Sequence, residues 1–264
     1  MTSTPRATRL WEIDLARTVA IAMMVVYHAA YDVDFLAPSA GVDPFNGGWR
    51  ALQVATGTLF LLIVGVSLWI SNSRARTKGA SGWPLYRRHA RRALQVLVAA
   101  LLVTVVTFVA LGSEDYIRFG ILHCIAVSML LAPAFVRLRL WNLPIAAAVI
   151  VVGLWLADER FGTSLLVPLG VRPEGQSLGV DYYPLLPWFG PVLIGLALAS
   201  VLYPRGQRGR WGARWPAVTP ALYRAGAPGR WALPIYLVHQ PILIPLVALA
   251  LLAAGVSLDL EGFR

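Results

Sequence analysis

Long apolar runs alternate with short polar segments along the whole chain. The runs are roughly 15–25 residues long, which is close to the length of helix that crosses the apolar core of a bilayer. This pattern predicts an all-α polytopic membrane helix bundle with about seven transmembrane helices in a single transmembrane domain, residues 1–264. The predicted spans lie near 13–36, 51–71, 93–112, 119–136, 143–157, 185–203 and 231–254.

The charged residues between the runs predict the orientation of the spans. Basic segments alternate with acidic ones, and an excess of arginine and lysine marks cytoplasmic loops. The alternation predicts a cytoplasmic N-terminus and an outside C-terminus, in the cytoplasmic (plasma) membrane. The basic set comprises Arg9, 72–92, Arg137 with Arg139, and 204–230; the acidic set includes Asp43, Glu114 with Asp115, Glu174 with Asp181, and Asp259.

The composition supports a membrane protein and limits the kinds of partner that we expect. Hydrophobic residues make up 58% of the chain and charged residues only 14%, whereas a soluble domain is about a quarter charged. The net charge of +10 is confined to short segments between apolar runs, so we expect a lipid bilayer and no nucleic acid as partner. Cys124 is the only cysteine, which excludes an internal disulfide and a thiolate metal cluster.

Three histidines lie inside the apolar runs: His28, His123 and His239. Ionisable side chains at that depth are costly and therefore indicate a functional site. Asp32 follows His28 by four residues, which places the two side chains on one helix face. A carboxylate can orient an imidazole and raise its basicity, so the pair suggests a general base. The alternative is a polar cluster that only holds helices together.

Ordered by their depth along the predicted helices, these polar residues form a series that extends across the membrane, here called the polar file. At 1.5 Å per residue, His28 lies about 22 Å from the inner face and Asp32 near the outer surface. His123 enters from outside to a similar level, below Arg118. Such a file is typical of a protein that moves a charge, an electron or a chemical group across the membrane. From the inside outwards it comprises Arg17, His239 with Gln240, His28, His123, Asp32 and Arg118.

Other polar residues have simpler interpretations beside functional ones. Arg87, Arg88 and Arg91 in the basic 72–92 segment could hold the phosphates of a cytosolic nucleotide cofactor, although orientation alone also explains their charge. His89, between them, is interpreted as a solvated loop residue. Gly57, Gly65 and Gly195 are interpreted as helix-packing positions.

Four stretches of the chain resemble a bacterial membrane family grouped with the catalytic domain of heparan-α-glucosaminide N-acetyltransferase. The resemblance implies transfer of an acetyl group from cytosolic acetyl-CoA to an acceptor on the far side. The chain departs from this resemblance in one segment. In the lysosomal enzyme the catalytic histidine lies just after the first span, but residues 37–50 contain no histidine here, so that catalytic assignment does not carry over. The stretches are RLWEIDLARTVAIAMMVVYHAAYD (9–32), RFGILH (118–123), DYYPLLPWFG (181–190) and IYLVHQP (235–241).

These features lead to one hypothesis, a membrane-bound acetyltransferase with acetyl-CoA as co-substrate and no metal or haem. His28, oriented by Asp32, would deprotonate an amine or hydroxyl of the acceptor or be acetylated itself. His123 and Arg118 would stabilise the developing oxyanion. The basic inner residues would hold the phosphates of acetyl-CoA. Asp181 and Tyr182 would contact an extracytoplasmic glycan or another polar acceptor.

Two other functions remain open at this point. A proton-coupled transporter or lipid-linked substrate carrier would use the same file as a proton relay. A membrane redox protein would use His28 and His123 as axial haem ligands. The sequence leaves open whether the protein is a monomer or a homodimer.

Overall fold

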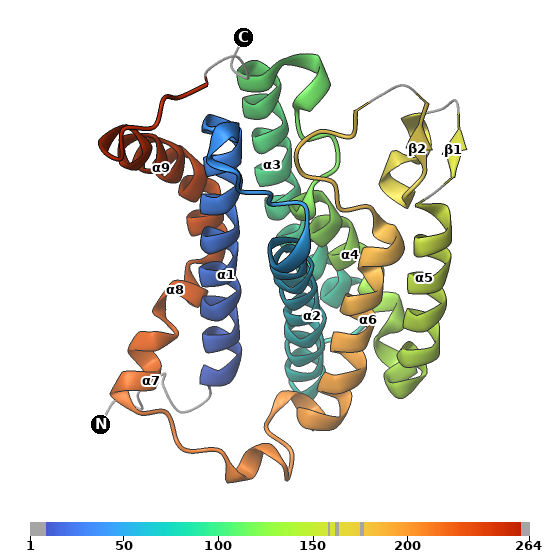
Figure 1. The fold of residues 1–264 in the computed structure, drawn as a ribbon. Helices are drawn as coiled ribbons and strands as arrows, with labels where there is room; N and C mark the ends of the chain where they lie inside the picture. The colour runs from blue at the N-terminus through green and yellow to red at the C-terminus, as the bar shows by residue number, and fades with distance from the viewer. Residues whose placement is uncertain (1–8, 158, 162–163, 175–176, 260–264) are drawn as a thin grey trace. The chain divides into compact units, whose positions relative to one another are not determined.

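The computed structural model describes residues 9–157, 159–161, 164–174 and 177–259. The long elements within these ranges are all helices, which confirms the all-α prediction, and the strands are one parallel pair of two residues each (Figure 1). The α-helices are α1 (Trp11–Leu36), α2 (Gly47–Thr77), α3 (Gly82–Asp115), α4 (Ile121–Phe135), α5 (Asn142–Leu156), α6 (Leu185–Leu202), α7 (Pro220–Ala225), α8 (Ala227–Arg230) and α9 (Ala232–Ala253). The shorter elements are η2 (Pro38–Ala40), η3 (Val136–Trp141), β1 (Arg160–Phe161), η4 (Ser164–Leu169), β2 (Arg172–Pro173), η5 (Pro204–Gly206) and η6 (Gly212–Arg214).

Six helical stretches in the described ranges are long and apolar enough to cross a membrane, rather than the seven predicted. The protein is therefore a multi-pass membrane protein. The difference arises because the predicted fourth and fifth spans together form one candidate stretch, Ile121–Leu156. Within it, η3 separates α4 from α5, and Arg139 has a left-handed backbone (φ 50°).

The chain returns after α5 to the end at which α4 began. Ile121 at the start of α4 donates its amide proton to Asp181, which lies just before α6, at 3.0 Å. The Tyr183 amide likewise donates to the Phe119 carbonyl at 3.0 Å. The starts of α4 and α6 therefore lie side by side, and both α4 and α5 pack against α6.

The chain divides into two compact units, residues 1–60 with 216–264 and residues 61–215. In the first unit α1 packs against α8 and α9. At Gly229 an added Cβ atom would lie 2.0 Å from the Asp14 carbonyl oxygen, so only glycine permits this close approach. The Gly229 amide also donates to the Thr18 hydroxyl at 3.0 Å.

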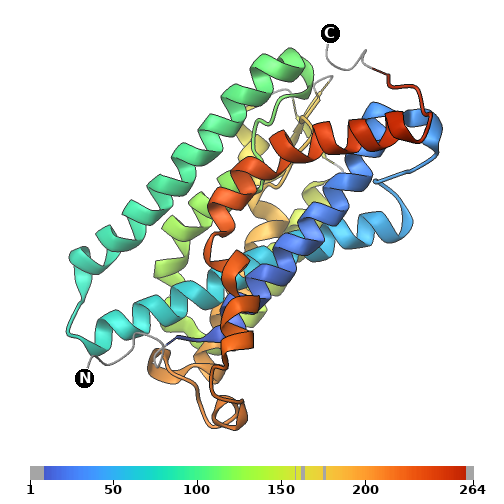
Figure 2. The same ribbon diagram turned by 90° about the vertical axis from the view of Figure 1, so that its left-hand side faces the viewer.

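Helices α1 and α9 of the first unit run in the same direction (Figures 1 and 2). The Trp11 indole, at the start of α1, donates to the Pro216 carbonyl at 3.1 Å. At the other end of α1, the Leu36 carbonyl accepts from the Asp259 amide at 2.7 Å. These contacts tie the segments before α7 and after α9 to the two ends of α1, and α9 itself packs along α1. This alignment positions the histidines described below.

The second unit is held together by glycines at helix crossings. An added Cβ at Gly65 of α2 would lie 2.1 Å from the Val192 carbonyl oxygen of α6. At Gly195 of α6 it would lie 2.2 Å from the Leu62 carbonyl oxygen of α2. The backbones of α2 and α6 thus come into close contact, which small residues permit in membrane helices. This confirms the packing interpretation of Gly65 and Gly195.

Candidate functional site

Two histidines meet where α1 contacts α9. The ring centroids of His28 and His239 lie 4.8 Å apart, with the ring planes at 78° in an edge-to-face arrangement. His28 is half-buried and His239 is 9% exposed. From sequence these two residues were assigned different depths, so their direct contact was not foreseen.

Both rings use Nδ1 to bind a backbone carbonyl of their own helix. His28 Nδ1 lies 2.8 Å from the Met24 oxygen, and His239 Nδ1 lies 2.6 Å from the Tyr236 oxygen. A carbonyl oxygen can only accept a hydrogen bond, so these partners assign the proton of each neutral ring to Nδ1. The Nε2 atom of each ring then carries a lone pair, which is what a general base or nucleophile requires.

Asp32 pairs with Gln240 rather than with His28, which corrects the predicted orienting contact. The Gln240 side-chain amide donates to Asp32 Oδ1 at 2.9 Å. His28 makes its Nδ1 bond one turn earlier, to Met24, and the Asp32 carboxylate is engaged from α9. The spacing within α1 was correctly interpreted as one helix face, but the partner on the neighbouring helix cannot be seen in the spacing.

Three buried polar atoms at this contact have no hydrogen-bond partner within the described part of the chain. They are Asp32 Oδ2, Gln240 Oε1 and His239 Nε2. An ionised carboxylate oxygen, an amide oxygen and the Nε2 of a ring protonated on Nδ1 are all acceptors. A group that satisfies them must donate, as an amine or a hydroxyl does.

Arg17 is held at the inner end of the predicted file by an ion pair. Its Nη1 atom lies 3.2 Å from Asp14 Oδ1, and Arg9 Nε lies 2.6 Å from the other oxygen of the same carboxylate. Asp14 is only 5% exposed. Arg9 and Arg17 thus neutralise one buried carboxylate. A role of Arg17 in a channel stays a prediction.

His123, in the second unit, has the opposite tautomer. Its Nδ1 accepts from the Gly120 amide at 3.3 Å, so the neutral ring carries its proton on Nε2. That atom lies 3.5 Å from the hydroxyl oxygen of Thr104, which itself donates to the Ile117 carbonyl. His123 is therefore a donor rather than a base. Thr104 was missed in the sequence because a single threonine in an apolar run carries no distinct signal.

Asp181, predicted to contact an acceptor, bonds the first turn of α4. Its Oδ2 accepts from the Ile121 amide, and an added Cβ at Gly120 would lie 2.2 Å from that oxygen. Burial raises the pKa of Asp181 to about 6, although the Ile121 hydrogen bond lowers it in part. Asp181 thus serves as a tertiary cap for α4, and its contact with an acceptor stays a prediction.

Tyr182 and Arg118 are also engaged within the second unit. The Tyr182 hydroxyl donates to the Val167 carbonyl at 2.8 Å, and burial raises the pKa of Tyr182 to about 12, against the opposing effect of the Arg172 charge. Arg118 donates to the Ser113 carbonyl at 3.0 Å, and its guanidinium lies 5.0 Å from the Tyr116 ring centroid. The contacts of Tyr182 and Arg118 with a substrate stay predictions.

The basic residues at the start of α3 face outward. Arg87, Arg88 and Arg91 are all exposed, which leaves their side chains accessible to a phosphate. His89 was wrongly interpreted as a solvated loop residue, since it is part of α3 and only 2% exposed. The physical reason is that the helix extends further than the apolar run, so one face of its basic end is covered.

Asp181→Asn should remove a pH dependence of stability. A folded-state pKa near 6 means that the folded protein binds this proton more tightly than the unfolded chain, where the pKa is about 3.9. The free energy of unfolding should therefore fall, by on the order of 2 kcal/mol, as pH rises from about 4 to about 6. Asparagine has no such proton but can still accept from Ile121.

Thermal unfolding in detergent at about pH 4 and about pH 6 would measure this fall. Asp43→Asn is the matched control, because the side chain of Asn46 lowers the pKa of that exposed carboxylate. The prediction is wrong if the native protein and Asp181→Asn lose the same stability over this interval.

Comparison with known protein families gives a match over most of the chain. A family model described as "Heparan-alpha-glucosaminide N-acetyltransferase, catalytic" matches residues 9–241. The range includes both histidines of the α1–α9 contact and His123, and it confirms the resemblance suggested by the four sequence stretches. No curated protein and no solved structure matches the chain.

Proposed function

Because the chain belongs to the family of the heparan-α-glucosaminide N-acetyltransferase catalytic domain, we propose that it transfers an acetyl group from cytosolic acetyl-CoA to an extracytoplasmic, sugar-containing acceptor. The observation that carries this proposal is the His28–His239 pair. Two imidazoles present Nε2 lone pairs at one helix contact, inside the matched range. That is the chemical equipment of a base in acyl transfer.

His28 is the base in this proposal, because the residue as a whole is half-buried whereas His239 is buried. Its Nε2 takes a proton from the acceptor amine or hydroxyl as the new bond to the acetyl carbon forms. The thioester C–S bond then breaks, and CoA leaves as a thiolate that takes up the proton. In a two-step variant, Nε2 itself attacks the thioester carbonyl, the C–S bond breaks and CoA leaves as a thiolate. The acetyl group then passes from the ring to the acceptor, and the thiolate takes up the proton that the acceptor loses.

The unsatisfied atoms beside the pair support an acceptor rich in donors. Asp32 Oδ2, Gln240 Oε1 and His239 Nε2 can accept from an amine or from sugar hydroxyls. We keep for His123 the role of oxyanion donor expected from the sequence, and the proton on its Nε2 suits that role. Arg118 is the second group proposed for that role.

Seven crossings, with the N-terminus inside and the C-terminus outside, complete the proposed topology. The adjacent starts of α4 and α6 require an even number of passes between them, which α4 and α5 supply. The first and last spans run in the same direction (Figure 2), as an odd total requires. We further propose that the chain is a single transmembrane domain in the plasma membrane, with the exposed arginines of α3 at the phosphates of acetyl-CoA.

Release of CoA thiol from acetyl-CoA by the purified protein tests the proposed function. The assay would compare detergent samples with and without an amino sugar such as glucosamine, and follow the thiol and the acetylated sugar together. Cys124 is fully buried, and Cys124→Ala removes any background from its thiol. We expect thiol release that depends on the amino sugar, in equal amounts with acetylated product. If the protein neither releases CoA thiol nor binds acetyl-CoA, the proposal is contradicted.

A further inference from the structure

A loop of arginines and tryptophans follows α6 in the second unit. The Arg–Trp loop (residues 203–215) contains η5 and η6 and carries Arg205, Arg208, Arg210 and Arg214 together with Trp211 and Trp215. No aspartate or glutamate occurs between residues 182 and 258 of the sequence. The positive charge of the loop therefore has no acidic neighbour along this part of the chain.

The loop is folded onto the end of α2 rather than extended. The Trp69 indole donates to the Tyr203 carbonyl at 3.0 Å. The Arg74 side chain donates to the Gly206 carbonyl at 2.7 Å, and Gly206 has a left-handed backbone (φ 74°). A Cβ atom at Gly206 would lie 2.9 Å from the Ile70 carbonyl oxygen. The arginines are thus presented from a fixed backbone.

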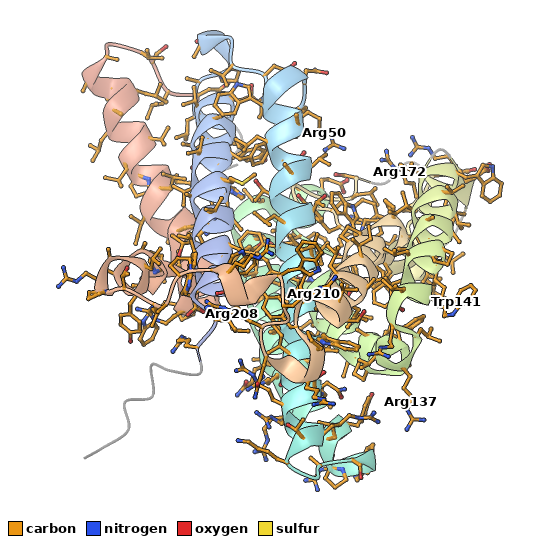
Figure 3. All side chains as sticks on the ribbon, turned by 90° about the horizontal axis from the view of Figure 1, so that it is seen from below. Arg50, Arg137, Trp141, Arg172, Arg208 and Arg210 are labelled. Atoms are coloured by element: carbon orange, nitrogen blue, oxygen red, sulfur yellow. The ribbon has the colours of Figure 1, made fainter. Side chains whose placement is uncertain are left out.

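Each of two arginines in the loop lies over an exposed indole. The Arg208 guanidinium lies 6.0 Å from the Trp215 ring centroid, and that of Arg210 lies 5.5 Å from the Trp211 ring centroid. The indoles of Trp211 and Trp215 are 56% and 39% exposed. In Figure 3, Arg208 and Arg210 lie on the loop that faces the viewer. Stacking on an indole orients a guanidinium group.

The position of the loop along the chain indicates what it faces. Helix α6 has 18 residues, a length of about 27 Å, which is close to the apolar thickness of a bilayer. The loop begins at the next residue and so lies at the interface with the lipid headgroups. Exposed tryptophans favour that level, and arginine forks match the oxygens of a phosphate.

We propose that the Arg–Trp loop is a binding surface for the headgroups of anionic phospholipids. Orientation by positive charge explains arginines in an inner loop, but it does not explain exposed indoles stacked with them on an anchored backbone. The proposal goes beyond acetyl transfer and does not depend on it. It predicts that the protein retains anionic lipids in preference to zwitterionic ones, and that the preference resides in this loop.

Native mass spectrometry of the intact chain tests the proposal. The protein would be purified in detergent micelles with equal amounts of phosphatidylglycerol and phosphatidylcholine, and the retained lipids counted. We expect phosphatidylglycerol to be preferred, and the preference to fall about fivefold for each arginine removed, so about 25-fold in R208Q/R210Q. Unfolding temperatures of the two proteins would be compared to verify that the variant is folded.

A variant with the same loss of charge is the control. Arg137 and Arg139 are exposed on the turn between α4 and α5, and R137Q/R139Q removes two charges outside the loop. Figure 3 labels Arg137. Retention should be largely kept in this variant. An equal fall in both variants, or in neither, would overturn the proposal. Displacement of the lipid by added CoA would also overturn it, because the loop would then be a site for nucleotide phosphates.

Discussion

Replacing His28 with asparagine is expected to lower kcat for acetyl transfer by about 10²–10⁴-fold while leaving the binding of acetyl-CoA intact. The asparagine amide can still donate to the Met24 carbonyl in place of Nδ1, but it has no counterpart of the Nε2 lone pair. This substitution therefore separates the chemical role of the ring from its contact within α1. Alanine at the same position would remove both.

Steady-state kinetics with acetyl-CoA and glucosamine, beside a direct measurement of CoA binding, would check this result. His123→Gln serves as the comparison on the donor side, because glutamine can still supply an N–H near the Nε2 position. A His28→Asn variant that folds, binds acetyl-CoA and retains the native kcat would show that His28 is not the base. Loss of acetyl-CoA binding in the folded variant would instead place His28 at the donor site.

Replacing Asp32 with asparagine is expected to raise KM for the amine acceptor by about 10–100-fold. A hydrogen bond to a charged group contributes roughly 1.5–3 kcal/mol, and this charge would be lost. The asparagine oxygen can still accept from Gln240, so the link between α1 and α9 survives. A raised KM with an unchanged unfolding temperature would identify Asp32 as a residue that binds the acceptor.

The matched control for this experiment is Asp34→Asn, which removes the same charge two residues further along α1. KM for glucosamine should change little in that variant. If Asp32→Asn and Asp34→Asn raise KM equally, the effect is one of general charge and Asp32 does not contact the acceptor. If Asp32→Asn lowers only the unfolding temperature, the carboxylate has a structural role.

The apolar runs were sufficient to predict the all-α multi-pass architecture, because a helix that crosses a bilayer must satisfy its backbone polar groups internally and cover itself with apolar side chains. That constraint is local, so it is visible in the sequence. The same logic identified His28, Asp32 and His239, since ionisable residues stand out against an apolar background. Glycines at crossings, such as Gly65 and Gly195, were recognised for the related reason that small residues permit close packing.

What the sequence could not decide were the partners of these groups. Asp32 and His28 share a face of α1, yet the carboxylate is bound by Gln240 from a helix more than 200 residues later in the chain. The ring of His28 meets His239 rather than Asp32, because α9 runs beside α1 in the same direction. Likewise, the proton of His123 is assigned to Nε2 only by the Gly120 amide that bonds its Nδ1. Periodicity determines which face of a helix is polar, whereas the packing of distant helices decides which atoms on that face meet and which remain free to bind a substrate.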